Sequence, residues 1–573
     1  MPVLHQWDYL FAFGVLAAAL DSYNIGANDV ANSFATSVGS RSLTLLQACL
    51  AAAVMEFLGG VLVGARVSGT VKNGIISLAA FQNNAGVQLL GFTVALCCSA
   101  SWLMIATRYS WPVSTTYSIV SALAGVGVAV GGADSVNWGW NDGKGLATIF
   151  AGFLIAPGIS AGFAAVVYML TKYGVLLRKN PLRAGFIAAP IFFFGVSAIL
   201  TMVIVYKGSP TLHLDEKPPN QMAAIILGAS SVVSLLSVLF WLPYVYCKTV
   251  RNDYTLRFYH FFLGPMLWYR QPPADAADGV VSAVPDYRHV KEEIPQTDSS
   301  QQFHVDEEKV SETGSQDFKR MPAPDAPAVP PAPQPAALAA VDAHPIVGEW
   351  YLPKNLWTIL RYKSGSYLWK ALTHGMLVDV HALQANDNLD DMHRRAVQYD
   401  NKTEHLYSFI QVMTACTASF AHGANDLGNA VGPFSAIFEI WHTGVPAGRN
   451  STTPVWILVA GASFLVLGLA TYGYKIMATL GNRLTLHSPS RGYSMELGSA
   501  ITVLLASQYA IPVSTTMCIT GGTLGVALCN GDIKSFNWKH LGWIVLGWVL
   551  TVPVVGVAAG CTMGIILNAP HFV

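Results

Sequence analysis

Two short polar motifs each occur twice in this chain, and their acidic, amide and hydroxyl side chains are suited to binding ions. One motif reads Gly-Ala-Asn-Asp-x-x-Asn at residues 26–32 and again at residues 423–429. The other reads Pro-Val-Ser-Thr-Thr at residues 112–116 and again at residues 512–516. Each copy lies within or against a long apolar segment, where polar groups are costly. Because the copies keep their order and spacing, the pattern predicts a solute site at the interface of two internal repeats.

The first motif places a carboxylate and two amides on one helical segment. Its asparagines are four residues apart and therefore share a helix face. Carboxylate and amide oxygens are hard ligands suited to Na⁺. Gly26 and Gly423 predict a relaxed backbone, and a locally unwound helix would add free carbonyl groups. The alternative is simple capping of a half-helix, which two matched copies make less attractive. The predicted Na⁺ ligands are Asn28, Asp29, Asn32, Asn425, Asp426 and Asn429.

The second motif has the composition of a helix start. Proline is favoured in the first helical turn, where Ser and Thr hydroxyls cap or donate and the positive end of the helix dipole binds anions. The alternative is a helix that restarts after a short loop, but the duplication favours an anion site. Phosphate can donate a P–OH proton to the aspartates, whereas sulfate cannot. The predicted phosphate ligands are Asp29, Ser114, Thr115, Thr116, Asp426, Ser514, Thr515 and Thr516.

Three further ionisable residues stand close to apolar runs. Glu56 lies inside the run Leu50–Leu62, and Glu496 directly precedes the run Leu497–Ala506. Carboxylates inside a membrane are rare, so both are candidate functional residues. An interfacial position is the alternative for Glu496. His422 precedes the second copy of the first motif, and a packing role is favoured for it over proton transfer.

The composition indicates a polytopic membrane protein. The 573 residues are 53% hydrophobic and 12% charged, whereas soluble proteins carry about 25% charged residues. The formal net charge of zero argues against a nucleic-acid partner. The eight cysteines show no zinc or disulfide spacing. HExxH does not occur, and the GxSxG match at residues 158–162 lies in the middle of an apolar run, so an intramembrane hydrolase is disfavoured, and no cofactor is predicted.

Apolar runs of spanning length fall in two groups. Since about 20 apolar residues cross a bilayer as a helix, the runs predict an all-α membrane protein with about 12 transmembrane helices. Seven crossings between the motif copies would turn the second copy upside down, giving two inverted-topology repeats with broken helices or hairpins. The runs cover residues 9–27, 43–65, 87–108, 112–132, 146–171, 184–206, 222–246, 405–438, 454–475, 495–510, 511–530 and 540–566.

The predicted domain organisation follows from these two groups. Residues 1–245 form an N-terminal transmembrane half with the first repeat, and residues 405–573 form a C-terminal half with the second. Residues 246–404 form a polar loop that contains a Pro/Ala tract too poor in apolar surface to fold, so part of it is predicted to be disordered. Basic residues after the fifth and seventh runs place this loop in the cytoplasm and both termini outside.

The repeated motifs, together with Ser419–Asp426 (SFAHGAND), resemble the signatures of the inorganic phosphate transporter family. The resemblance covers about residues 1–245 and 405–570 and is strongest to fungal plasma-membrane, sodium-dependent members. It implies symport of inorganic phosphate with Na⁺ by alternating access, with a rocking or elevator-like movement. It also implies that the motif residues bind Na⁺ and phosphate and that Glu56 and Glu496 are needed for transport. The expected partners are phosphate, Na⁺ and the lipid bilayer, and a homodimer is left open.

Two other functions remain open from the residues alone. Asp and Glu side chains can carry protons, so coupling to H⁺ is an alternative to coupling to Na⁺. A membrane phosphate sensor that signals through residues 248–404 is an alternative of a different class.

Overall fold

The computed structural model describes residues 7–76, 78–140, 145–207, 217–273, 282–287, 349–376, 378, 389–448, 453–508 and 513–569. Contacts group the chain into one large unit, residues 1–289 with 370–573, and a small unit, residues 290–369. The small unit lies within the predicted loop, and its described part contains α10 (Pro353–Thr358) and most of α11 (Ser364–Leu372). The predicted disordered Pro/Ala tract lies outside the described residues. The domain boundaries at 245 and 405 stay predictions.

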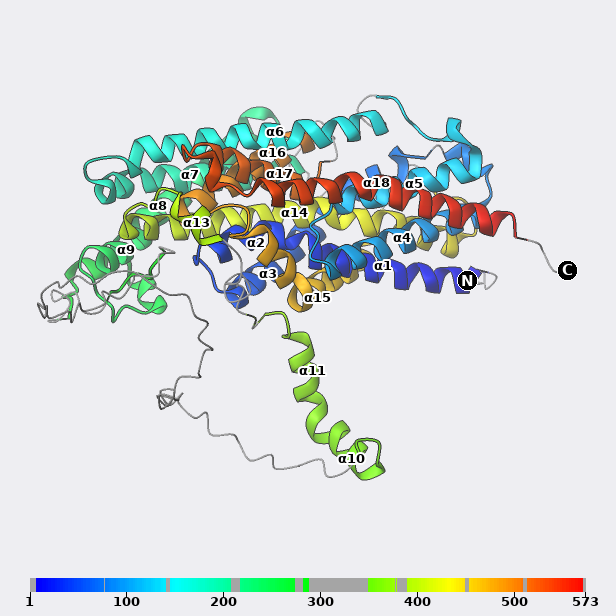
Figure 1. Cartoon of the computed structure of the whole chain (residues 1–573), viewed down its shortest axis with the longest axis horizontal. Helices are drawn as coiled ribbons and strands as arrows, with labels where there is room; N and C mark the ends of the chain where they lie inside the picture. The colour runs from blue at the N-terminus through cyan, green and yellow to red at the C-terminus, as the bar shows by residue number, and fades with distance from the viewer. Residues whose placement is uncertain are drawn as a thin grey trace, which may run out of the picture. The chain divides into compact units, whose positions relative to one another are not determined.

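The large unit is helical in all its longer described segments (Figure 1). Its first part contains α1 (Asp8–Asn28), α2 (Val30–Gly39), α3 (Leu45–Gly74), α4 (Ala85–Arg108), α5 (Thr115–Gly131), α6 (Leu146–Thr171), α7 (Pro181–Lys207), α8 (Pro219–Leu236) and α9 (Leu242–Thr249). Its second part contains α13 (Leu389–Arg394), α14 (Asn401–Thr443), α15 (Val455–Leu480), α16 (Pro489–Gln508), α17 (Thr515–Leu528) and α18 (Trp538–Leu567).

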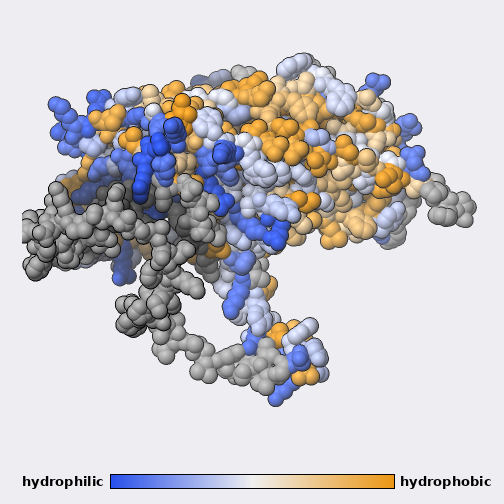
Figure 2. Space-filling view, in the orientation of Figure 1, coloured by the Kyte–Doolittle hydropathy of each residue, from blue (hydrophilic) through white to orange (hydrophobic). Residues whose placement is uncertain are grey.

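Eight helical segments of the described chain are long and apolar enough to cross a membrane. Figure 2 shows apolar side chains spread widely over the exposed helical surface, as lipid contact requires. The prediction of a polytopic helical membrane protein is therefore confirmed. The count of 12 crossings is not, because α5 and α17 have only 17 and 14 residues. The eight segments are Asp8–Gly39, Leu45–Gly64, Ala85–Arg108, Leu146–Leu176, Pro181–Met202, Pro219–Thr249, Val455–Leu480 and Trp538–Leu567.

The short helices belong to two helical hairpins. α4 packs against α5 and α16 packs against α17, and each turn carries one copy of the Pro-Val-Ser-Thr-Thr motif. Figure 1 shows α4 and α5 toward one end of the body and α16 and α17 toward the other. A hairpin returns the chain to the side from which it started. A hairpin therefore leaves the parity of the seven predicted crossings between the motif copies unchanged, and an odd number inverts the second copy.

The two repeats pack against each other through reciprocal pairs of helices. α1 packs along α15 of the other repeat, and α14 packs along α3. In the same way α5 packs along α18, and α17 packs along α6. Each of these four pairings thus has a counterpart in which the two repeats exchange roles. This exchange brings equivalent residues of the two repeats to one place in the middle of the bundle.

The motif glycines allow these close pairings. A Cβ atom on Gly26 would lie 1.8 Å from the backbone oxygen of Leu465, and one on Gly423 would lie 2.4 Å from that of Glu56. The prediction of unwound backbone at these glycines was wrong. α14 continues unbroken through the second motif copy, and between α1 and α2 Asp29 keeps φ −94° and ψ −31°. Here glycine allows the two helices to approach each other closely, because only a hydrogen atom fits between their backbones.

Candidate functional site

The carboxylate of Asp29 lies where both motifs of both repeats meet. Asp29 stands between α1 and α2 and is 2% exposed. Its Oδ2 accepts a hydrogen bond from the Thr115 hydroxyl at 2.5 Å, and its Oδ1 accepts one from the Thr516 hydroxyl at 2.8 Å. Thr115 belongs to the same repeat and Thr516 to the other. The carboxylate therefore ties the two repeats together.

Asp426, in the middle of α14, has the corresponding arrangement and is 1% exposed. Its Oδ2 accepts a hydrogen bond from the Thr515 hydroxyl at 3.0 Å, and its Oδ1 accepts one from the Thr116 hydroxyl at 3.2 Å. Again one donor comes from each repeat. The structure thus brings together both aspartates and all four motif threonines, and their roles as ligands stay predictions.

The threonines stand at the first turns of two helices. α5 begins at Thr115 and α17 begins at Thr515, and each follows a serine in extended conformation. Ser114 caps α5 by accepting a hydrogen bond from the Tyr117 N–H at 3.3 Å, whereas Ser514 makes no capping bond. The positive ends of both helix dipoles therefore meet at the two carboxylates, which is the electrostatic environment that favours bound anions.

The last asparagine of each motif copy completes the reciprocal network. Asn32 donates from Nδ2 to the Thr516 hydroxyl at 2.7 Å and to Asp29 Oδ1 at 3.3 Å. Asn429 donates from Nδ2 to the Thr116 hydroxyl at 3.0 Å and to Asp426 Oδ1 at 3.4 Å. Each amide thus donates hydrogen bonds to an aspartate of its own repeat and to a threonine of the other repeat.

The first asparagines of the two motif copies differ in their contacts. Asn28 accepts a hydrogen bond from the Val113 N–H at 3.2 Å and donates to the Thr107 hydroxyl and the Trp111 carbonyl, both at 3.1 Å. It fastens the α4–α5 turn to α1. Asn425 donates to Asp426 Oδ1 at 3.1 Å. Asn28 and Asn425 thus occupy equivalent positions in the two motif copies but make different contacts.

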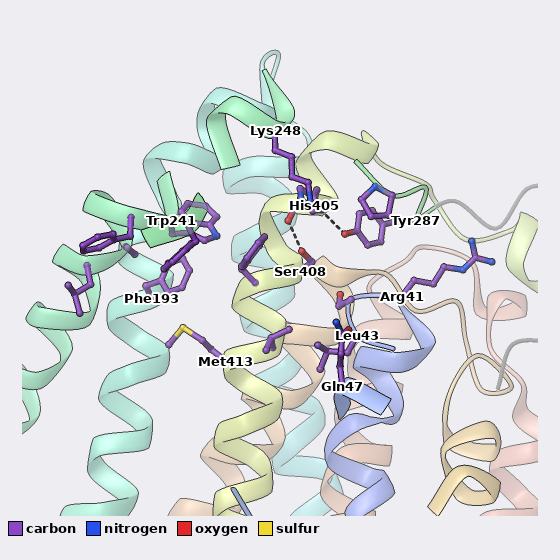
Figure 3. A pocket seen from close by; sticks show the side chains of 18 of the residues that line it. Arg41, Leu43, Gln47, Phe193, Trp241, Lys248, Tyr287, His405, Ser408 and Met413 are labelled. Atoms are coloured by element: carbon purple, nitrogen blue, oxygen red, sulfur yellow. Dashed lines mark hydrogen bonds between the residues drawn. The ribbon is translucent and has the colours of Figure 1, made fainter. Parts of the chain in front are cut away.

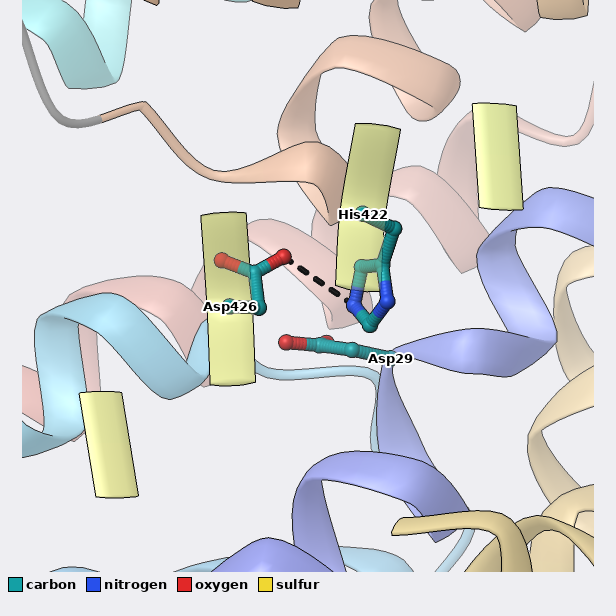
Figure 4. Close-up of side chains that lie close together, drawn as sticks. All are labelled: Asp29, His422 and Asp426. Carbon is teal, nitrogen blue, oxygen red and sulfur yellow. Dashed lines mark ion pairs between the residues drawn. The ribbon is translucent and has the colours of Figure 1, made fainter. Parts of the chain in front are cut away.

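His422 links the second motif copy to Glu56. Its Nδ1 lies 2.8 Å from Glu56 Oε2. Its Nε2 lies 3.0 Å from Asp426 Oδ2, and Figure 4 shows this ion pair. Glu56 also accepts a hydrogen bond from the Ser419 hydroxyl at 2.8 Å. The prediction that favoured simple packing for His422 missed this bridge between two carboxylates. The presence of one intramembrane glutamate without a repeat counterpart was the signal that could have indicated it.

Glu496 is fully buried among a separate group of polar side chains, and its position relative to the membrane interface stays a prediction. Its Oε1 accepts hydrogen bonds from the Thr36 and Ser37 hydroxyls, at 2.5 and 2.8 Å, and from Gln411 Nε2 at 3.3 Å. Its Oε2 accepts one from the Thr414 hydroxyl at 2.5 Å. Sequence reasoning missed these donors, which lie on α2 and α14 one to three turns away from the motifs.

The centre of the network gathers side-chain atoms of the kinds that can hold a cation. Ligand atoms of Asp29, His422 and Asp426 lie within 4.8 Å of one another. A separate cavity of about 20 Å³ is bordered by Asn32 and Thr515, but none of Asp29, His422 and Asp426 lines it. Such a volume holds a single water-sized guest. The carboxylate and hydroxyl oxygens match the ligand preference of Na⁺.

A many-pass helical bundle with internal repeats that pack reciprocally is the architecture of secondary transporters. A family model described as the phosphate transporter family matches residues 25–559. The chain belongs to that family, and the resemblance noted from its motifs is confirmed.

The sequences of known proteins align with nearly the whole chain. It is 42% identical to the phosphate-repressible phosphate permease pho-4 of Neurospora crassa, covering 100% of this chain and 99% of the relative. It is 26% identical to the mouse sodium-dependent phosphate transporter 1, covering 97% and 95%. A solved structure titled the sodium-dependent phosphate transporter covers 98% of this chain and 100% of its own, with a TM-score of 0.62 and 23% identity. That likeness supports the fold. The family and these relatives are transporters and permeases, so the prediction of a protein that is not an enzyme is confirmed.

Proposed function

We propose that this protein is a symporter that imports inorganic phosphate together with Na⁺ by alternating access. The observation that carries the proposal is the reciprocal network in which Asp29 and Asp426 each bind threonines of both repeats. Its donors and acceptors fit a partly protonated oxyanion, and its clustered oxygens fit a cation.

Cation binding would have to come before phosphate. The two carboxylates have oxygens within 4.8 Å of each other, so their mutual repulsion is on the order of 3 kcal/mol at an effective dielectric constant of about 20. An incoming phosphate anion would meet both charges. Na⁺ bound to Asp29 and Asp426 removes this barrier and leaves the threonine hydroxyls and helix N-termini free to bind phosphate oxygens.

The reciprocal packing of the repeats suits an exchange between outward- and inward-open states. Each hairpin packs against a helix of the other repeat, so a movement of one hairpin opens one side of the site while its counterpart closes the other. Glu56 and Glu496 contribute to this exchange because each joins helices of different repeats.

The orientation follows from the exposed basic residues. Arg178, Lys179 and Arg183 lie at the turn between α6 and α7, at the opposite end of the body from the start of α1. The positive-inside rule then places this turn and the central loop in the cytoplasm and both termini outside the plasma membrane.

The direct test is uptake of radiolabelled phosphate into vesicles that contain the purified protein. We expect uptake to require an inward Na⁺ gradient and to stop when choline replaces Na⁺. A tenfold excess of sulfate should leave uptake nearly unchanged, because sulfate has no proton to donate to the aspartates. Equal uptake with and without Na⁺ would remove the coupling ion from the proposal, and equal competition by sulfate would remove the basis of selectivity.

H⁺ coupling is the second candidate, and the bridge of His422 between Glu56 and Asp426 favours it. A histidine between carboxylates can carry a proton near neutral pH. Under this candidate, uptake without Na⁺ would follow an imposed pH gradient. The phosphate-sensor alternative depends on residues 248–404, of which the structure describes only a part, and it stays a prediction.

A further inference from the structure

A second, larger cavity lies away from the transport site, at the end of the bundle where α14 begins (Figure 3). It has a volume of about 990 Å³. Its walls come from the turn between α2 and α3, from α7, from α8 and the segments that follow it, and from the first turns of α14. Nothing in the proposed transport cycle uses it.

One end of this cavity is basic and polar. Lys248 borders it, and its ammonium has the Tyr244 ring 5.9 Å away but no carboxylate partner among the described residues. His405 is 4% exposed, and its Nδ1 lies 2.7 Å from the Tyr287 hydroxyl. Its Nε2 is buried without a hydrogen-bond partner in the described part of the chain. A buried ring nitrogen without a partner costs free energy unless a guest satisfies it.

The rest of the cavity is apolar and borders the lipid-facing surface. In the span Pro219–Thr249, only 11% of the most apolar stretch is buried inside the protein. Figure 3 shows Phe193, Trp241 and Met413 on the opposite side of the cavity from Lys248 and Tyr287. A guest that fills this space must therefore have a long apolar part and a polar head. The apolar lining includes Phe193, Val233, Leu236, Phe240, Phe261 and Met413.

We propose that this cavity binds an anionic phospholipid, with the lipid phosphate at Lys248 and His405 and an acyl chain along Phe240 and Met413. Anionic headgroups suit basic pockets between transmembrane helices on the cytoplasmic side. The location fits, because the cavity lies at the end of the bundle that carries the basic turn between α6 and α7. Free phosphate has the same headgroup chemistry, but it would leave the apolar walls without a partner.

A second basic residue borders the cavity. Arg41 lines the cavity and has φ +62°, a left-handed conformation that glycine or asparagine adopts more readily. Its Nη1 donates a hydrogen bond to the Asp286 carbonyl oxygen at 3.4 Å. As a lining residue it adds positive charge to the cavity.

The test is native mass spectrometry of the purified full chain with added phosphatidylserine or phosphatidylcholine. We expect one phosphatidylserine bound per chain in preference to phosphatidylcholine. Lys248→Gln should weaken phosphatidylserine binding about fivefold, the loss expected for one cation near a headgroup. The matched control is Lys179→Gln, an exposed cation at the same end of the bundle outside the cavity, which should bind phosphatidylserine as the wild type does.

A second variant tests the apolar part and does not depend on Lys248. Val233→Trp should fill the acyl-chain region and reduce phosphatidylserine binding at least as much as the loss of the cation does. Equal binding of the two lipids by the wild type, or unchanged binding in Val233→Trp, would overturn the proposal. Displacement of the lipid by millimolar inorganic phosphate alone would also overturn it, because the cavity would then be a site for free anions.

Discussion

The centre of the transport site, around Asp29 and Asp426, has equivalent contacts in the two repeats, whereas its flanks, around His422 and Glu496, do not. At the centre, each contact of Asp29 has a counterpart at Asp426 in the other repeat. On the flanks this equivalence ends. His422 joins Asp426 to Glu56, whereas the corresponding position near Asp29 is occupied by Ile25, whose side chain cannot bridge carboxylates.

The difference suggests a division of labour. A centre with two-fold equivalence can be approached in the same way from either side of the membrane, as alternating access requires. Residues without a counterpart can distinguish the two sides or the coupling ion. Glu496 belongs to this second group, because its donors lie on α2 and α14 and have no matching set around Leu96.

The strongest test of the central equivalence is to neutralise either aspartate. Asp29→Asn and Asp426→Asn should each lower Na⁺-dependent phosphate uptake roughly 100-fold or more, because a charged ligand worth about 3 kcal/mol is lost. Uptake into vesicles at equal protein amounts measures the effect. Asp532→Asn, at an exposed turn, is the matched control and should transport normally. Substantial uptake by either central variant would refute the ligand role of that carboxylate.

A finer test compares two threonines that hold the aspartates of the opposite repeats. Thr116→Val and Thr516→Val should each lower uptake about tenfold, since each loses a hydrogen bond to a carboxylate. The matched control is Thr520→Val, one helical turn away, where the hydroxyl bonds only its own helix backbone. The comparison predicts similar losses in the two variants. If only one of them were impaired, the two halves of the centre would not be equivalent in function.

The flank can be tested at the histidine bridge. His422→Gln keeps a hydrogen-bonding side chain, but a glutamine amide cannot span the two carboxylates as the imidazole ring does. We expect about fivefold slower uptake with the Na⁺ requirement retained, in keeping with the loss of one charge-assisted hydrogen bond. The measurement is the initial rate as a function of Na⁺ concentration. A variant that transports at the wild-type rate would show that the bridge serves packing alone.

Sequence reasoning predicted the centre better than the flanks, and the reason is physical. Duplicated motifs indicate which residues meet, because a two-fold arrangement brings equivalent positions together. The partners of Glu496 and His422 come from single occurrences on distant helices, and no spacing reveals which helix faces them. Broken helices or hairpins were predicted only in general, with residues 87–108 and 112–132 taken as two crossings. The role of Gly26 in helix approach depends on the backbone of α15, which only the packing supplies.

The smallest expected effects come from the one motif position where sequence equivalence fails. Asn28 makes two hydrogen bonds with the α4–α5 turn and one with Thr107 at the end of α4, whereas Asn425 donates to its neighbour Asp426. Asn28→Ala should therefore destabilise the protein by about 2 kcal/mol, and Asn425→Ala by about 1 kcal/mol or less. Thermal unfolding of the two purified variants measures the difference. An equal loss of stability would mean that the motif position works alike in both repeats, and the asymmetry would then begin only at His422.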